Sequence, residues 1–112
     1  MKIQSRKNVA NVDLVDLEGD LDFHSSPELR SELAKLAERK APTILVDLKG
    51  VGYIDSSGLA TFVELFQRMK RYGGKLALFN LSAGVRSVFE IAKLDTIFKL
   101  AGSEKEALTL VS

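Results

Sequence analysis

Residues 43–48 form an apolar run in which Asp47 is the one charged residue. A strand that is buried on both faces has this pattern, and such strands occur mainly in parallel sheets whose two faces are both covered. An apolar stripe at helical spacing follows the run and consists of Leu59, Phe62, Val63, Phe66 and Met69. A strand followed by an amphipathic helix is the repeating unit of α/β folds. The run therefore predicts a central parallel strand in an α/β domain.

Strand and helix signals alternate along the rest of the chain. We expect strands at 2–6, 9–17, 43–48 with a continuation at 51–54, 75–79 and 97–100, and helices from Ser25, from near Leu59 to Gly73, from Ser82, and at 104–110. The first two strands, joined by a polar turn at Lys7-Asn8, are expected to form an antiparallel hairpin. Later strands connect through helices, which predicts a mostly parallel mixed sheet with about four helices.

The expected first helix has a start signal in its sequence. Ser25 and Glu28 have the spacing of a capping box, and Pro27 is tolerated in a first helical turn. Leu29 and Leu33 then begin an apolar stripe at helical spacing. We therefore expect Ser25 to cap this helix.

Composition limits the kinds of function that the chain can have. The 112 residues show no compositional break, so we expect one domain over 1–112. Sixteen basic against fifteen acidic residues leave a net charge of +1, which argues against direct contact with nucleic acid. No cysteine is present and His24 is the single histidine, so we expect no metal site and no cofactor.

Hydropathy along the chain argues against export and membrane insertion. The first residues lack the apolar core of a signal peptide, and every apolar run is far too short to span a bilayer. We therefore expect a cytoplasmic protein.

The segment Asp55-Ser56-Ser57-Gly58-Leu59 places two hydroxyl groups where a strand gives way to a helix. The free N–H groups and partial positive charge of a helix N-terminus favour a phosphate or another anion there. Aspartate and serine are also common N-caps, so the same residues fit a purely structural role. Loops 19–24 and 52–58 both follow strands at the carboxyl edge of the expected sheet, where functional loops gather. They are expected to be neighbours.

Four features in this order and spacing carry a resemblance to a known family. They are the segment 55–59 after an apolar strand, the segment 19–22 (Gly-Asp-Leu-Asp) after the second strand, the glycine pair 73–74 before a strand, and the helix at 82–93. Together they resemble the STAS-domain anti-sigma factor antagonists, which are small bacterial regulators that act by partner switching in transcription. The similarity covers nearly the whole chain.

The resemblance implies a phosphorylation switch. Ser57 would be phosphorylated by a serine kinase that is also the anti-sigma factor, and a PP2C-type phosphatase would remove the phosphate. The unphosphorylated form would bind the anti-sigma factor and release the sigma factor. Asp22 and Asp55 would contribute to kinase recognition and to the environment of the serine. The residues expected at the partner or kinase interface are Asp22, Phe23, His24, Asp55, Ser56, Gly58 and Leu59.

Single residues in this set also fit simpler roles. Phe23 would either form an exposed apolar contact beside Asp22 or anchor the loop to the core. His24 is expected at most at the periphery of an interface. Gly58 would mark either the close approach of another backbone or simple turn geometry.

Other functions compete with this one. A STAS-like accessory subunit of a lipid-transport ABC system would bind the ATPase subunit and need no phosphorylation. A hydrolase with Ser57 as nucleophile would need a general base and a G-x-S-x-G elbow, but Asp55 stands where the first glycine of that motif belongs. We therefore expect a protein that is not an enzyme.

Overall fold

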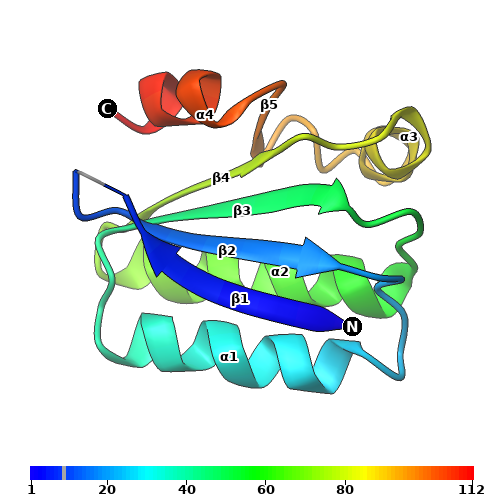
Figure 1. Ribbon diagram of the computed structural model, residues 1–112, viewed down its shortest axis with the longest axis horizontal. Coiled ribbons are helices and arrows are strands. Elements are labelled where there is room, and N and C mark those ends of the chain that lie inside the picture. Colours follow the sequence, from blue (N-terminus) through cyan, green and yellow to red (C-terminus); the bar gives the residue numbers. More distant parts are fainter. Residues whose placement is uncertain (9) are drawn as a thin grey trace.

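The computed structural model describes residues 1–8 and 10–112, which contain a five-stranded sheet (Figure 1). Its strands are β1 (Lys2–Lys7), β2 (Asp13–Glu18), β3 (Thr43–Gly50), β4 (Lys75–Phe79) and β5 (Lys99–Ala101). They lie side by side in chain order, with β1 antiparallel to β2 and each later pair parallel. The predicted mixed, mostly parallel sheet with an N-terminal antiparallel pair is thereby confirmed.

Helices cover both faces of the sheet. The described residues form four of them: α1 (Ser26–Glu38), α2 (Ser56–Arg71), α3 (Ala83–Ile91) and α4 (Glu104–Val111). Figure 1 shows α1 and α2 side by side under one face, α4 over the other face, and α3 at the end of β4. Within the described parts of the chain, no helix has both the length and the apolar character needed to cross a membrane.

The apolar run of β3 supplies both layers of the core. Ile44, Val46 and Leu48 belong to the larger apolar cluster, which also contains buried side chains of α1 and α2. Leu45 belongs to the second cluster, which contains Ala107 of α4. Successive strand residues point to opposite faces, so burial on both sides requires apolar residues in succession. The predicted central strand is confirmed.

The second strand begins later than predicted. We expected a strand over 9–17, but β2 starts at Asp13, and Val9 lies outside the described residues. The side chain of Asn8 accepts hydrogen bonds from the backbone N–H groups of Ala10 and Val12, both at 2.9 Å. Asn11 has a left-handed φ of 61°, which asparagine tolerates better than most residues. These asparagines hold a longer connection than the expected turn at Lys7-Asn8.

Three further boundaries differ from the predictions. Residues 51–54 do not continue β3, since only Ile54 pairs there, through an isolated parallel bridge to Leu21. Helix α2 begins at Ser56 and not near Leu59, because Asp55 caps it. The last strand lies at Lys99–Ala101 instead of 97–100.

Candidate functional site

Two loops meet at the carboxyl edge of the sheet, between β2 and α1 and between β3 and α2. The Leu21 N–H donates to the Tyr53 carbonyl at 2.9 Å, and the Asp55 N–H donates to the Leu21 carbonyl at 3.1 Å. A further bond, from the Gly19 N–H to the Gly50 carbonyl at 2.9 Å, joins the loops where the strands end. The expectation that these loops are neighbours is confirmed, and they are held together through their backbones.

Gly58 lets the first turn of α2 pack directly onto this junction. A Cβ atom at position 58 would lie 2.7 Å from Cγ1 of Ile54 and 2.8 Å from Cγ of Leu21, both of which are buried. No ordinary Cβ contact is that short, so a side chain here would displace one of the loops. Close approach explains the glycine, although it is to side chains and not to another backbone. Because Gly58 is buried, its effect on a partner would be indirect.

Asp55 is the N-cap of α2. Its Oδ1 accepts the backbone N–H groups of Ser57 at 2.9 Å and Gly58 at 3.1 Å, and its backbone is extended. Asp55 therefore has the capping role that its position in the sequence also allows. It also has a chemical consequence, because a carboxylate already occupies two of the backbone donors that a helix N-terminus would otherwise offer to a phosphate.

The two serines differ in exposure. Ser56 is exposed, while Ser57 is partly buried and its carbonyl accepts a hydrogen bond from the Thr61 hydroxyl at 3.0 Å. Leu59 is half-buried and packs against the larger apolar cluster. The predicted roles of these residues in phosphorylation and binding stay predictions, with Ser56 and Ser57 placed at the surface of the joined loops.

Asp22 organises the other loop, and the predicted capping box is wrong. Ser25 has helical backbone angles and makes no side-chain cap; its hydroxyl donates to the Asp20 carbonyl at 2.8 Å. The carboxylate Oδ1 of Asp22 accepts the backbone N–H groups of His24 at 2.9 Å and Ser25 at 3.1 Å instead. The bond from the Ser25 N–H is the main reason that the pKa of Asp22 lies below its ordinary value.

This arrangement gives an expected result for Asp22 variants. Asp22→Asn should keep the loop conformation, because an amide oxygen can still accept from His24 and Ser25, whereas Asp22→Ala should lose it. In the wild type, the lowered pKa means that the carboxylate supports the loop above the ordinary aspartate pKa. That support is lost as the pH falls through the lowered value.

NMR of the backbone amides of His24 and Ser25, followed from neutral to acidic pH, measures this effect. Below the pH range in which a histidine side chain titrates, the two resonances should shift with protonation of Asp22 in the wild type and move much less in Asp22→Asn. The assignment is wrong if both proteins behave alike.

Each of the two joined loops carries an exposed aromatic side chain. Phe23 is 64% exposed and its ring lies 4.0 Å, centroid to centroid, from that of His24. Of the two roles weighed for Phe23, the structure supports an exposed contact and not an anchor in the core. Tyr53 is 53% exposed on the other loop, and sequence reasoning missed it. Its exposure depends on how the two loops join, and the sequence pattern gives no signal for it.

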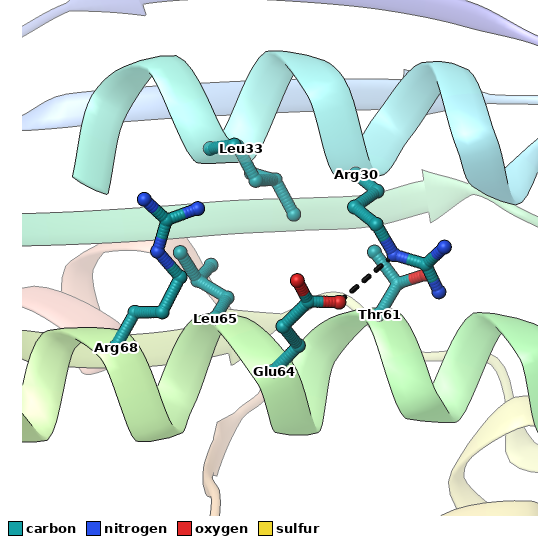
Figure 2. A pocket seen from close by; sticks show the side chains of 7 residues that line it. Arg30, Leu33, Thr61, Glu64, Leu65 and Arg68 are labelled. Carbon is teal, nitrogen blue, oxygen red and sulfur yellow. Dashed lines mark ion pairs between the residues drawn. The ribbon is translucent and has the colours of Figure 1, made fainter. Parts of the chain in front are cut away.

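A hollow between α1 and α2 lies one turn further along α2 from Ser57. Figure 2 shows Arg30 and Leu33 of α1 facing Thr61, Glu64, Leu65 and Arg68 of α2. Arg30 Nε and Glu64 Oε2 form an ion pair at 2.9 Å across it. The cavity volume is about 10 Å³, which is room for one water at most. It is therefore a seam between two helices and not a ligand pocket.

Comparison with known proteins places this site in context. A family model described as STAS domain matches residues 3–107. The anti-sigma-B factor antagonist of Bacillus subtilis (strain 168) is 38% identical over 91 residues, which are 81% of this chain and 83% of that protein.

Two solved structures share the fold. The anti-sigma factor antagonist SpoIIAA in its unphosphorylated form has a TM-score of 0.83 at 24% identity, covering 98% of this chain and 96% of that one. The phosphorylated form of SpoIIAA, a Bacillus cell fate determinant, has a TM-score of 0.76 at 23% identity, covering 99% and 100%. At these identities the likeness establishes the architecture.

Proposed function

The chain belongs to the STAS-domain family of anti-sigma factor antagonists, and we propose that it is a regulatory binding protein that releases a sigma factor by binding its anti-sigma factor. In this proposal the unphosphorylated form is the active one. The anti-sigma factor is also a serine kinase that phosphorylates Ser57, and a PP2C-type phosphatase restores the active form. The regulation takes place in the cytoplasm, without catalysis by this chain.

One observation carries the proposal. A serine lies at the start of a helix, on a surface that two loops form together, and Asp22 and Asp55 hold the backbone of those loops by hydrogen bonds. A phosphate at such a position changes the charge of a surface whose shape is already fixed by these hydrogen bonds. The packing of the core need not change. The structure of this chain resembles SpoIIAA in both its unphosphorylated and its phosphorylated forms, which supports a fold that tolerates the phosphate.

The size of the electrostatic change is adequate for a switch. A phosphoserine adds about −1.5 to −2 charges at neutral pH. Within this domain, solvent weakens repulsion between the phosphate and nearby carboxylates. Against a partner surface that excludes water and supplies no cation of its own, the added negative charge is costly to desolvate. A loss of about 3 kcal/mol there weakens binding more than a hundredfold.

The exposed aromatic side chains extend the expected interface. Phe23 and Tyr53 are large, exposed and located on the two joined loops, and aromatic residues dominate the binding energy of many interfaces. We include Tyr53 with Asp22, Phe23, His24, Asp55 and Ser56 among the residues that contact the partner. Gly58 and Leu59 lie beneath this surface and affect binding by positioning the residues above them.

Site-resolved mass spectrometry tests the proposal. The purified protein is incubated with ATP and lysate from its source cells, and Ser57→Ala and Ser56→Ala are treated in parallel. We expect one phosphate on Ser57 that is absent only from Ser57→Ala. If lysate that phosphorylates another substrate leaves this protein unmodified, the switch is wrong and an accessory subunit of a transport system becomes the better hypothesis.

A further inference from the structure

A phosphate on Ser57 would have few partners among the groups that define the candidate site. Asp55 already occupies the N–H groups of Ser57 and Gly58, and the neighbouring loop adds a second carboxylate, Asp22. Phosphoserine at a helix N-terminus is favourable when free donors or an arginine are available. With these two helix donors in use, a cation from another element would give the phosphate a strong partner.

We propose that Arg30 of α1 supplies this cation and, when Ser57 is phosphorylated, moves from Glu64 to bind the phosphate. The inference rests on the proposed function for the modification itself. It adds a phosphate-binding residue on a different helix, so that the phosphorylated side chain is tied to the seam between α1 and α2.

The position of Ser57 on α2 supports this assignment. Ser57, Thr61 and Glu64 are spaced at i, i+4 and i+7, so they share one side of the helix. Figure 2 shows that Thr61 and Glu64 face α1, where the side chain of Arg30 lies. The hydrogen bond from the Thr61 hydroxyl to the Ser57 carbonyl, at 3.0 Å, links the two residues directly. Ser57 is therefore one turn beyond the residues that Arg30 already reaches.

The orientation of Arg30 brings its charge toward Ser57. Side chains on a helix lean toward its N-terminus, and α1 starts at the same edge of the sheet as α2. In Figure 2 the guanidinium lies on the Thr61 side of Glu64, with its terminal nitrogens pointing away from the Glu64 carboxylate. The ion pair uses Nε. Residues one turn apart have Cβ atoms about 5–6 Å from each other, which a rotation of this long side chain can span.

The exchange of partners is favourable on chemical grounds. The side chains of Arg30 and Glu64 are 46% and 47% exposed, and ion pairs with that much solvent contact are weak. A phosphate carries more charge than a carboxylate and accepts two parallel hydrogen bonds from a guanidinium. Glu64, once released, remains hydrated. Arg30 would thus exchange a weak ion pair with Glu64 for a stronger one with the phosphate.

Phosphorus NMR of protein with phosphoserine inserted at position 57 by genetic code expansion tests this pairing. A nearby cation favours the dianion, so the second pKa of the phosphate should be lower in the wild type than in Arg30→Gln by about 0.5 or more. Lys35→Gln removes the same charge from the exposed side of α1, where Lys35 pairs with Glu32. It should leave the phosphate pKa close to the wild-type value at physiological salt.

Equal phosphate pKa values in the wild type and Arg30→Gln would overturn the inference, as would equal effects of Arg30→Gln and Lys35→Gln. The other ionisable groups on the two joined loops and on the side of α2 that faces α1 are the same in all three proteins; they include Asp20, Asp22, His24, Asp55 and Glu64. Because phosphoserine is installed without a kinase, this result is independent of whether cells phosphorylate Ser57. Failure of the proposed function would instead appear in the mass spectrometry experiment.

Discussion

Replacing Ser57 with aspartate should weaken binding to the anti-sigma factor more than a hundredfold, whereas Ser57→Ala should bind as tightly as the unphosphorylated wild type. The aspartate places a negative charge where the proposed partner excludes water, and the loss of about 3 kcal/mol corresponds to that change in affinity. Alanine removes only the Ser57 hydroxyl group. The backbone at this position keeps its hydrogen bonds to the Asp55 carboxylate and from the Thr61 hydroxyl. Isothermal titration calorimetry with the kinase-type anti-sigma factor from the same organism measures both affinities.

A charge control separates the site from the overall effect of one more acidic group. Ser103 is the N-cap of α4, on the opposite face of the sheet, and its hydroxyl accepts from the Glu106 N–H. Aspartate is an equally good N-cap, so Ser103→Asp adds the same charge without removing the cap. It should leave the affinity unchanged. The switch is refuted if Ser57→Asp and Ser57→Ala bind equally well.

Gly58→Ala should lower the free energy of unfolding by about 1–2 kcal/mol, although alanine is the better helix former. Alanine gains up to about 1 kcal/mol in a helix interior, but overpacking a buried site costs about 1–3 kcal/mol. The new methyl group would lie 2.7 Å from Ile54 and 2.8 Å from Leu21, and both side chains are buried with little room to move. Urea unfolding followed by circular dichroism measures the change.

Gly84→Ala is the matched control for this prediction. Gly84 is also a glycine in the first turn of a helix, but a Cβ at that position has no neighbour within 4 Å among the described residues. The substitution should therefore leave stability unchanged or raise it by up to about 1 kcal/mol. Should both alanine variants unfold at the same urea concentration, the packing explanation for Gly58 fails.

The order of elements was predictable from sequence because it depends on burial. The apolar run of β3 and the stripe on α2 are determined by side chains that must leave water, and the structure places both as predicted. Element ends depend on local hydrogen bonds that compete closely. Ser25 and Glu28 have the spacing of a capping box, but the Ser25 hydroxyl instead donates to the Asp20 carbonyl and accepts from the Asp22 N–H. Similarly, the Asn8 side chain accepts the N–H groups of Ala10 and Val12, and β2 begins only at Asp13.

The candidate site was predictable where it lies in one contiguous segment. The serines, with Asp55 before them, are visible in the sequence as a change from strand to helix. Contacts between segments that are far apart in the sequence could not be predicted in this way. The ion pair of Arg30 with Glu64 requires the relative alignment of α1 and α2, and the exposure of Tyr53 requires knowledge of how the two loops join. Neither follows from spacing along the chain.

The backbone junction between the two loops has a kinetic consequence. With Leu21 bonded to both Tyr53 and Asp55, the surface around the serines has its shape before a partner arrives. A kinase or phosphatase docking there loses little conformational entropy in ordering it. Encounters can then proceed nearly as between rigid bodies, limited by diffusion and orientation more than by loop rearrangement. A regulator built in this way can exchange partners quickly while the rest of its structure stays unchanged.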